Sequence, residues 1–334
     1  MNTYLSSRRS FLQKSSVTMA ALFAASAGKS VFAQSPVEQL RMLVGFPPGS
    51  VPDTVARLVA EQLAGSYPRR TLVENRPGAA GQIAVNALKS GPADGSAVLL
   101  AQGTVASAYP YLYSKLAYDP AVDLKPVSLA AEVTLGLAVG PAVPASVGNV
   151  RELVKWMRSN PKLANAASPG VGTPPHLLEA ILFRQADVAW QHVAYAGGPP
   201  AMAALLGGQV AALVLPEGLL RQHQAAGRLR VLATSGAQRS RYLPDIASFV
   251  EQGYPGLVVI DWFAFFMSGS VIPAVIDATS QKLSAAIARP ELAAAFAESG
   301  MVAASSTPAA LTARIAADQR YWEPVIRENG IRVE

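Results

Sequence analysis

The sequence contains no cysteine and only three histidines among its 334 residues. Without cysteine the chain can form no disulfide bond and perform no thiolate chemistry, so packing alone must hold its fold together. The hydrophobic content of 51% is sufficient for that. Three histidines without a His-Glu-x-x-His motif give no zinc signature, and we expect neither a metal nor a cofactor.

Several motifs of enzymes and nucleic-acid binders are also missing. The Gly-x-Ser-x-Gly pentapeptide of serine hydrolases does not occur, and the nearest match, Ser168-Pro169-Gly170, lacks the preceding glycine. The first strand is followed by neither Gly-x-Gly-x-x-Gly nor a Walker lysine, which argues against nucleotide binding. No run of lysine and arginine indicates nucleic acid. An exported hydrolase with an unrecognised site is the enzyme alternative that stays open.

Residues 1–33 have the features of a cleaved export signal and are left out of the fold prediction. Arg8 and Arg9 are followed by Ser-Phe-Leu-Gln, as in a twin-arginine signal, and the late Lys29 favours that route over general secretion. The alanine-rich core is too short and too weakly apolar for a membrane anchor. We expect cleavage near Ala33 and a periplasmic location. The segment carries four basic residues and no acidic one, so its removal lowers the net charge from +6 to +2.

One stretch near the start of the mature chain organises the rest of the prediction. Leu40–Phe46 is a short apolar run of the kind that forms a buried strand. Pro47-Pro48-Gly49 favours a stiff turn, and Ser50 with Asp53 has the spacing of a helix N-terminus. We expect the amides of this turn to be unpaired and to attract an anion such as a carboxylate.

The strand and helix pattern predicts an α/β protein with two lobes. Residues 40–101 alternate strand, helix, strand, helix, strand, which is typical of a parallel sheet with covered faces. Two longer apolar runs, Val127–Val139 and residues 257–268, are interpreted as strands that cross between lobes. We predict a first lobe of residues 34–129 and 250–334 and a second lobe of residues 130–249, with a ligand cleft between them.

Other turns follow strands in the same way as the first loop. Gln102-Gly103-Thr104 lies after the third predicted strand, and residues 168–176 and 195–200 are stiff, glycine-rich and proline-rich turns after strands of the second lobe. Ligands of parallel sheets bind beyond the carboxyl ends of the strands. We therefore expect these turns to face the cleft together with the first loop.

Seven short motifs, in order along the chain, carry a family resemblance. They are Gly45-Phe46-Pro47-Pro48-Gly49-Ser50-Val51-Pro52-Asp53 with Ala56-Arg57; Val73-Glu74-Asn75-Arg76-Pro77-Gly78-Ala79-Ala80-Gly81; Pro92-Ala93-Asp94-Gly95; Leu112-Tyr113 with Tyr118-Asp119-Pro120; Gly172-Thr173 before His176-Leu177; Val193 and Tyr195 before Gly197; and Gly207-Gly208-Gln209-Val210. Together they resemble the substrate-binding proteins of tripartite tricarboxylate transporters, the Bug family. The resemblance covers nearly all of residues 36–331.

The resemblance implies a type II periplasmic-binding-protein fold, in which two α/β lobes joined by two crossover strands close on a ligand. It implies a monomeric receptor without catalytic activity that binds a small mono-, di- or tricarboxylate or an aromatic acid. The membrane partner that it implies is a permease of the tripartite tricarboxylate type; a sensor subunit that presents ligand to another partner is the alternative. Carried over residue by residue, it places in ligand binding Phe46, Pro48, Gly49, Ser50, Ser168, Gly172, Thr173, His176, Gly197 and Gly198.

Two departures from the family pattern bear on the ligand. Ser50 stands where glycine is usual, so it adds a hydroxyl and a Cβ beside the expected anion site. Ala211 stands where aspartate is common, and Glu217 follows the same strand, where it could face an amine or hydroxyl of the ligand or simply begin the next helix. Thr104 joins the candidate ligand-binding residues because it follows the third strand.

The remaining polar candidates have structural interpretations. We expect Asp53 to cap its helix and brace the first loop, and Arg57 to pair with it one turn later. His176 could contact the ligand or be a satisfied structural histidine, two possibilities of similar weight. The other two histidines, His192 and His223, attract no role. Among the aromatic residues of the second crossover, Trp262 is a modest candidate for a pocket wall.

Overall fold

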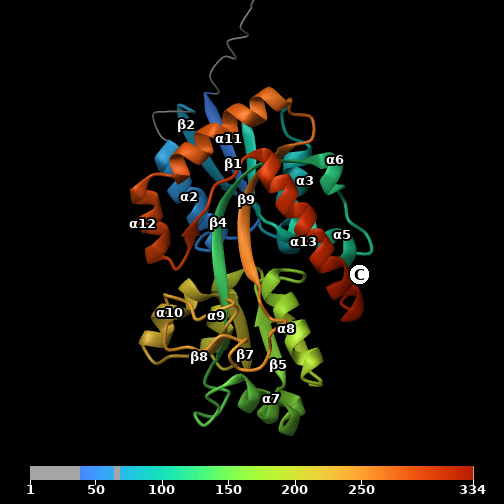
Figure 1. The fold of residues 1–334 in the computed structure, drawn as a ribbon, viewed down its shortest axis with the longest axis vertical. Helices are drawn as coiled ribbons and strands as arrows, with labels where there is room; N and C mark the ends of the chain where they lie inside the picture. The colour runs from blue at the N-terminus through green and yellow to red at the C-terminus, as the bar shows by residue number, and fades with distance from the viewer. Residues whose placement is uncertain (1–37, 64–67, 334) are drawn as a thin grey trace, which may run out of the picture. The chain divides into compact units, whose positions relative to one another are not determined.

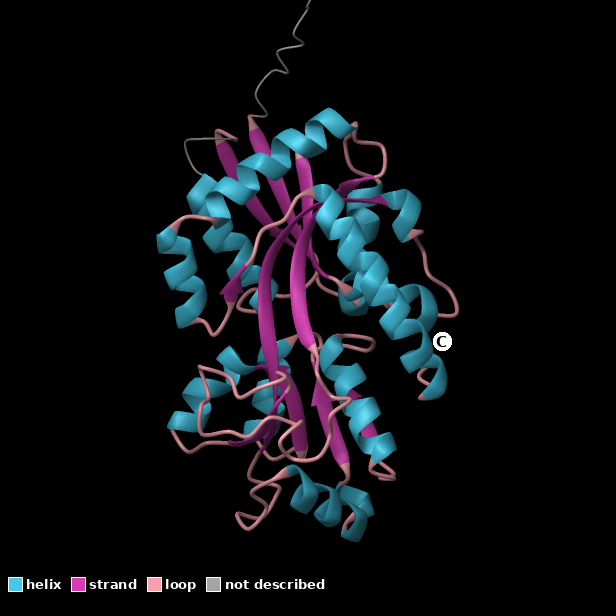
Figure 2. Ribbon diagram, in the orientation of Figure 1, coloured by secondary structure: helices cyan, strands magenta, loops and turns pink. Residues whose placement is uncertain are grey.

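The computed structural model describes residues 38–63 and 68–333, in which α-helices and β-strands alternate along most of the chain (Figures 1 and 2). The predicted export signal, residues 1–33, lies outside the described residues. Within the described part, no helix combines the length and the apolar composition needed to cross a membrane.

The first lobe begins with a parallel three-stranded unit. β1 (Gln39–Val44) lies between β2 (Arg70–Asn75) and β3 (Ala97–Gln102) and pairs in parallel with both. α2 (Val51–Leu63) connects β1 to β2, and η1 (Ala79–Gly81) with α3 (Gln82–Lys89) connects β2 to β3. The alternation predicted for residues 40–101 is confirmed.

One long strand, β4 (Leu124–Val139), belongs to both lobes. Residues 124–134 of β4 pair antiparallel with β9 (Ile260–Ser268) of the first lobe. Residues 135–139 pair instead with β7 (Ala212–Pro216) and β8 (Arg230–Thr234) of the second lobe. Figure 1 shows β4 and β9 side by side, reaching from one group of elements toward the other. The predicted crossover at Val127–Val139 is confirmed.

Ser235 ties the two chain crossings together. Its N–H donates to the carbonyl of Leu135, and its Oγ accepts from the N–H of Leu135 at 2.9 Å. The same hydroxyl donates to the carbonyl of Val259, directly before β9. The two crossings therefore run next to each other at the boundary between the lobes, which is where a hinge motion would bend them.

The second lobe repeats the strand–turn–helix pattern. β5 (Asn165–Ser168) lies between β6 (Gln191–Ala194) and β7 and is parallel to both. Its helices are, in chain order, α7 (Val150–Ser159), α8 (Pro174–Gln185), α9 (Gly198–Leu206) and α10 (Glu217–Ala225). The short helix η2 (Pro161–Leu163) precedes β5.

The chain ends on the first lobe with three helices. α11 (Pro273–Ile287) and α12 (Pro290–Glu298) pack against α2, and α13 (Pro308–Glu328) packs against β4. The two-residue strand β10 (Val302–Ala303) adds to β4 in antiparallel direction. The predicted division at residues 130 and 250 stays a prediction, although β4 and the Val259–Ile260 segment are where the chain passes between the lobes.

Three short helices follow β3, namely α4 (Thr104–Ser107), α5 (Tyr109–Leu112) and α6 (Pro120–Asp123). The aromatic-rich sequence of Tyr109–Asp119 predicts a turn-like stretch, and this prediction is wrong for its first four residues, which form α5. Its first residue, Tyr109, is fully buried and packs with Leu112 in the main core cluster, so tertiary packing favours a helical turn over an exposed loop.

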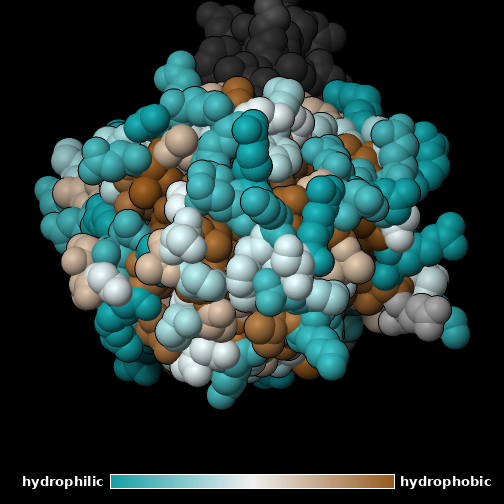
Figure 3. Space-filling model, turned by 90° about the horizontal axis from the view of Figure 1, so that it is seen from below, coloured by the Kyte–Doolittle hydropathy of each residue, from teal (hydrophilic) through white to brown (hydrophobic). Residues whose placement is uncertain are grey.

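β9 is buried on both faces. Phe263 and Phe265 pack into one core cluster, whereas Trp262 and Phe266 pack into another. The strand is therefore a central one, covered on each side by helices, which explains its continuous apolar sequence. Seen from below, the surface is mainly hydrophilic, with hydrophobic atoms scattered between polar side chains (Figure 3).

Candidate functional site

The first loop connects β1 to α2, and its amides are already bonded within the loop. The N–H of Gly49 donates to Asp53 Oδ2 at 2.9 Å, and the N–H of Ser50 donates to the carbonyl of Pro47 at 3.2 Å. The Ser50 hydroxyl donates to the same carbonyl at 2.7 Å. The expectation that the Gly49 and Ser50 amides are unpaired is therefore wrong, because the fold uses these donors to close the turn. Pro48 is exposed.

Asp53 holds this loop from the first turn of α2, where only 3% of it is exposed. Its carboxylate also accepts from Arg57 Nε at 3.0 Å and from Asn75 Nδ2 at 2.8 Å. Asn75 in turn donates to the carbonyl of Phe46 at 3.0 Å. Burial raises the pKa of Asp53, but the hydrogen bonds from Arg57, Gly49 and Asn75 outweigh it and leave the pKa below its ordinary value. The expected pair of Asp53 and Arg57 is present, and Asp53 braces the loop.

The turn after β5 is also closed by its own side chains. Ser168 Oγ donates to the carbonyl of Gly170 at 3.1 Å, and Thr173 Oγ1 donates to the same carbonyl at 2.7 Å. The N–H of Gly172 donates to His176 Nδ1 at 3.0 Å. Ser168 and Thr173 are fully buried. These four predicted binding residues thus share one compact turn, in which the side chains of Ser168, Thr173 and His176 shape the backbone.

His176 stacks on His192, with ring centroids 3.9 Å apart, and His192 Nε2 lies 2.8 Å from Ser168 Oγ. Burial lowers the pKa of His176 to about 3 and that of His192 to about 4. Both rings are therefore neutral at neutral pH, and they brace the turn through their contacts with Gly172 and Ser168. Of the two possibilities for His176, this geometry matches the satisfied structural histidine, and His192 gains a role that the sequence did not suggest.

The lobes touch at glycines of the second lobe. A Cβ built on Gly197 would lie 2.8 Å from two ring atoms of Pro47, and a Cβ on Gly170 would lie 3.2 Å from the Ala80 side chain. The hydroxyl of Tyr113 in the first lobe donates to the carbonyl of Val171 in the second at 2.9 Å. Small residues at these points allow the two lobes to approach within contact distance.

A cavity of about 370 Å³ opens where these turns meet. Its walls come from the first loop, from the turn before α3, from Tyr113 and the C-terminal Val333, and from the turns after β5 and β6. The lining residues are Gly45, Phe46, Pro47, Pro77, Gly78, Ala79, Ala80, Gln82, Tyr113, Pro169, Gly170, Val171, Ala194, Tyr195, Ala196 and Val333. None of these described lining residues carries a charge, and most are apolar.

Two alanines of this wall have left-handed backbone conformations. Ala79 has φ 46° and Ala80 has φ 50°. Such conformations cost roughly 1 kcal/mol or more for residues other than glycine and concentrate at functional sites. The carbonyl of Ala80 is held by the hydroxyl of Tyr109 at 2.9 Å, so the strained turn is fixed by a buried side chain.

A second, much smaller cavity of about 20 Å³ lies between the lobes on the other side of Phe46 and Pro169. Ser50, Gln102 and Phe263 line it from the first lobe, whereas Gly198 and Leu215 line it from the second. A volume of this size holds one water-sized group. It shares Phe46 and Pro169 with the larger cavity, so the two are parts of one inter-lobe site.

Three further candidates lie outside these cavity walls. Thr104 is buried in α4 and is not among the described residues lining either cavity. Trp262 is packed against Gly103, and its Nε1 donates to Asp318 at 2.7 Å, so it belongs to the core of the first lobe. Glu217, at the start of α10, accepts from Ser240 Oγ at 2.7 Å, and burial raises its pKa to about 7.

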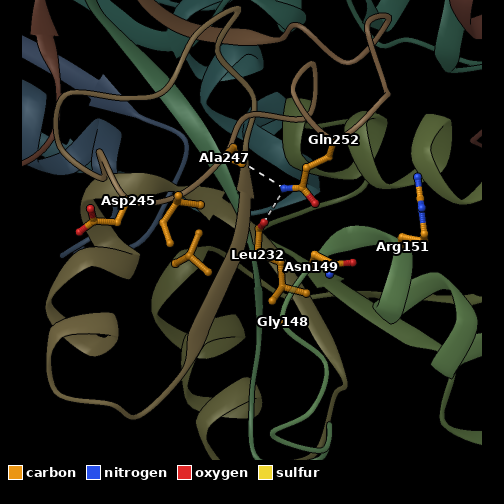
Figure 4. Close-up of a pocket in the computed structure, with 9 residues that line it drawn as sticks. Gly148, Asn149, Arg151, Leu232, Asp245, Ala247 and Gln252 are labelled. Carbon is orange, nitrogen blue, oxygen red and sulfur yellow. Dashed lines mark hydrogen bonds between the residues drawn. The ribbon is translucent and has the colours of Figure 1, made fainter.

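Another cavity, of about 400 Å³, lies in the second lobe between α7 and β8 (Figure 4). Gln252 reaches across it, and its Nε2 donates to the carbonyls of Leu232 at 2.7 Å and of Ala247 at 3.4 Å. Asn149 lines the same cavity while its side chain caps α7. The side-chain amides of Gln252 and Asn149 are thus engaged in hydrogen bonds to the backbone. Among the described residues, no group of three or more His, Asp or Glu side chains could hold a metal ion.

Sequence reasoning placed the right turns at the inter-lobe site but missed several side chains in it. Phe46 lines both cavities, and Ser50 and Gly198 line the small one. Gln82 and Tyr113 were not proposed as ligand contacts. Gln102 was predicted only as part of the Gln102-Gly103-Thr104 turn facing the cleft, on the basis of its place at the carboxyl end of the third strand.

Comparison with known proteins identifies relatives along nearly the whole chain. The family model described as tripartite tricarboxylate transporter family receptor matches residues 55–331. Protein BugT of Bordetella pertussis is 30% identical, with 90% of this chain and 91% of that protein aligned.

Two solved structures superpose closely. The periplasmic binding protein BugD has a TM-score of 0.82 at 26% identity, covering 90% of this chain and all of that one. An R. palustris protein solved with adipate has a TM-score of 0.83 at 25% identity, covering 88% of this chain and 98% of that one. These likenesses, with the two α/β lobes and the crossover strands described above, confirm the predicted fold class, a periplasmic-binding-protein fold.

Proposed function

Because this chain belongs to the tripartite tricarboxylate transporter receptor family, we propose that it captures a small carboxylic acid between its lobes and delivers it to a membrane permease. The family consists of periplasmic solute receptors, so the chain is a binding protein and not an enzyme. We propose in addition a class of ligand, a binding site and a membrane partner for this chain.

The observation that carries the proposal is the composition of the inter-lobe cavity. It is lined by the loops that the family motifs pick out, and its described lining residues are apolar or neutral. A ligand built mainly of methylene or aromatic groups would pack favourably against such walls. The solved R. palustris relative with adipate, a chain of methylenes between two carboxylates, is consistent with this chemistry.

The carboxylate of the ligand would be held by neutral donors. Tyr195 and Gln82 bring a hydroxyl and an amide group to the cavity wall. Hydrogen bonds to an ionised carboxylate are stronger than those between neutral groups, so a few of them suffice without an arginine clamp. Binding without a buried cation also suits a receptor that must release its ligand. Closure would follow from contacts made only when the lobes meet, such as the one between Tyr113 and Val171.

We also propose an export route and an oligomeric state for this chain. Residues 1–33 would be removed near Ala33 after export by the twin-arginine route, and the mature chain would act in the periplasm as a monomer. Its partner would be a permease of the tripartite tricarboxylate type, which receives the closed, loaded receptor.

A thermal-shift screen of the mature chain tests the ligand class. The panel contains adipate, malate, succinate, citrate and benzoate, with adipamide and glucose as uncharged controls. An acid at 100 times its Kd should stabilise the folded state by about 2.7 kcal/mol and raise the melting temperature accordingly. If the uncharged compounds shift the melting temperature and no acid does, the carboxylate proposal is wrong.

A further inference from the structure

Gln102 occupies a distinctive position at the inter-lobe site. It ends β3, is 5% exposed, and lines the small cavity together with residues of both lobes. Its partner in the sheet is Phe263 of β9, so the side chain stands at the point where the first lobe faces the second. Among the lining residues of this cavity it has the longest polar side chain, and the only carboxamide.

One end of the Gln102 carboxamide is fixed and the other is free. Nε2 donates to Asp261 Oδ2 at 2.8 Å. Oε1 of Gln102 is buried and has no hydrogen-bond partner among the described residues. A buried polar atom without a partner is costly, and here it belongs to a residue that lines a cavity. The unpaired end of the carboxamide is therefore the part of this cavity wall that a ligand can engage.

Asp261 is the group that fixes Gln102, and its surroundings disfavour its charge. It lies in β9 with 2% exposure, and none of the described lysines and arginines is bonded to it. The groups facing it are Tyr109 of α5 and Asp318 of α13; Asp318 lies near Arg314 of the same helix and Glu132 of β4. Burial raises the pKa of Asp261 to about 7, the negative charge of Asp318 adds to this, and the hydrogen bonds from Gln102 and the Trp262 backbone oppose it.

A carboxamide has the same shape after a half turn about its last bond, so the protonation of Asp261 decides which end faces the cavity. Ionised Asp261 accepts from Nε2 and leaves the oxygen toward the ligand, where it repels a carboxylate. Protonated Asp261 donates its O–H to the oxygen and leaves the NH₂ group toward the ligand, where it can donate to a carboxylate.

We propose that Gln102 is a ligand-contacting residue of the inter-lobe site and that Asp261 positions it, so that binding of a carboxylate takes up one proton from solvent onto Asp261. This inference rests on the proposed function, because it concerns the same site and the same class of ligand. It adds that the receptor binds acids more tightly in acidic than in alkaline medium, although each acid of the panel keeps at least one ionised carboxylate over this range.

The size of the effect follows from the fraction of Asp261 that is protonated. If only the protonated form binds, the apparent Kd is the intrinsic value divided by that fraction. With a midpoint near pH 7, the apparent Kd rises about tenfold between pH 6 and pH 8. Proton uptake on binding is about half a proton at pH 7 and approaches one at pH 8.

Calorimetric titration of the mature chain with the same five acids tests the inference. Each acid is titrated at pH 6, 7 and 8 in buffers of low and high ionisation enthalpy, which gives the Kd and the number of protons taken up. We expect a tenfold weaker Kd at pH 8 than at pH 6 and uptake near one proton at pH 8. Tight binding with a constant Kd and no proton uptake would overturn this inference and leave the proposed function intact. Absence of binding by every acid at every pH would overturn both.

Variants locate the proton. In Asp261→Asn the ratio of the Kd values at pH 8 and pH 6 should fall to about one and proton uptake should vanish. Gln102→Met, which keeps the shape and removes both polar ends, should weaken binding and also abolish the pH dependence, and it serves if Asp261→Asn does not fold. Glu217→Gln changes another buried carboxyl and should keep the tenfold ratio. If it removes the pH dependence, the proton resides on Glu217 and Asp261 is not the positioning group.

Discussion

The network around Asp53 gives a stability prediction that can be worked from the structure. Replacing Asp53 by alanine removes an acceptor from the Gly49 amide, the Arg57 guanidinium and the Asn75 carboxamide. A hydrogen bond to a charged group contributes about 1.5–3 kcal/mol. Gly49 and Arg57 are exposed, so their donors regain water in the variant, and the loss is smaller than three such bonds. We expect the free energy of unfolding to fall by about 2–3 kcal/mol.

Urea unfolding followed by tryptophan fluorescence measures this change. The matched control is Asp277→Ala on the exposed face of α11, which should stay within about 0.5 kcal/mol of the wild type. The pKa of Asp53 is lowered in the folded state, so its contribution is present above the unfolded pKa of about 4 and is lost as the pH falls through the folded value. The stabilities of the wild type and Asp53→Ala should therefore approach each other as the pH falls through the folded pKa of Asp53. A loss under about 0.5 kcal/mol at pH 7, or one that does not shrink in acid, would refute this account of the first loop.

Three further changes probe the site and the core. Tyr113→Phe removes the hydrogen bond between the lobes and should weaken acid binding by about two- to tenfold. Tyr118→Phe is its control, because the Tyr118 hydroxyl bonds to Val105 within the first lobe, and it should lower stability only. Equal affinities in the two variants would contradict this. Gly197→Ala places a Cβ against Pro47 and should weaken binding in calorimetry. Gly227→Ala, at a glycine that also has a positive φ (67°) but open space around it, should leave binding unchanged and cost only about 1 kcal/mol of stability. Glu179 is fully buried and accepts from the Val214 amide, and burial raises its pKa well above the ordinary value. The fold favours the neutral form of Glu179, so the free energy of unfolding of the wild type decreases as the pH rises above about 4.5. Glu179→Gln should therefore be more stable than the wild type at pH 8, and the difference should vanish at pH 4. Equal differences at the two pH values in urea denaturation would exclude this cause.

The fold was largely predictable from the sequence because local signals agree with the tertiary structure. Strand and helix alternation over residues 40–101 is strict, and proline and glycine mark the turns between elements. The long apolar run at Val127–Val139 is longer than an ordinary strand, which is why it identified a crossing between lobes. α5 was missed because the helical conformation of Tyr109–Leu112 depends on burial of its aromatic ring, which local sequence does not reveal.

The candidate site was predictable at the level of loops but not of individual contacts. Proline and glycine patterns located the turns at 47–50, 168–173 and 195–198, all of which meet between the lobes. Which amides stay free depends on side-chain partners in three dimensions. Asp53 takes the Gly49 amide and His176 takes the Gly172 amide, although both donors were expected for the ligand. Gln102 was predicted only as part of a turn and Tyr113 only as part of a family motif, because neither pattern shows which side chain reaches the site.

The central claim is that a carboxylic acid binds between the lobes, and a crystal structure of the mature chain with the tightest-binding acid of the panel tests it most directly. The account predicts that the acid lies between Phe46–Pro47 and Ala79–Ala80 on one side and Pro169–Val171 and Tyr195 on the other, with the lobes in contact around it. An acid bound instead in the cavity between α7 and β8, with the inter-lobe site occupied only by water, would contradict the account.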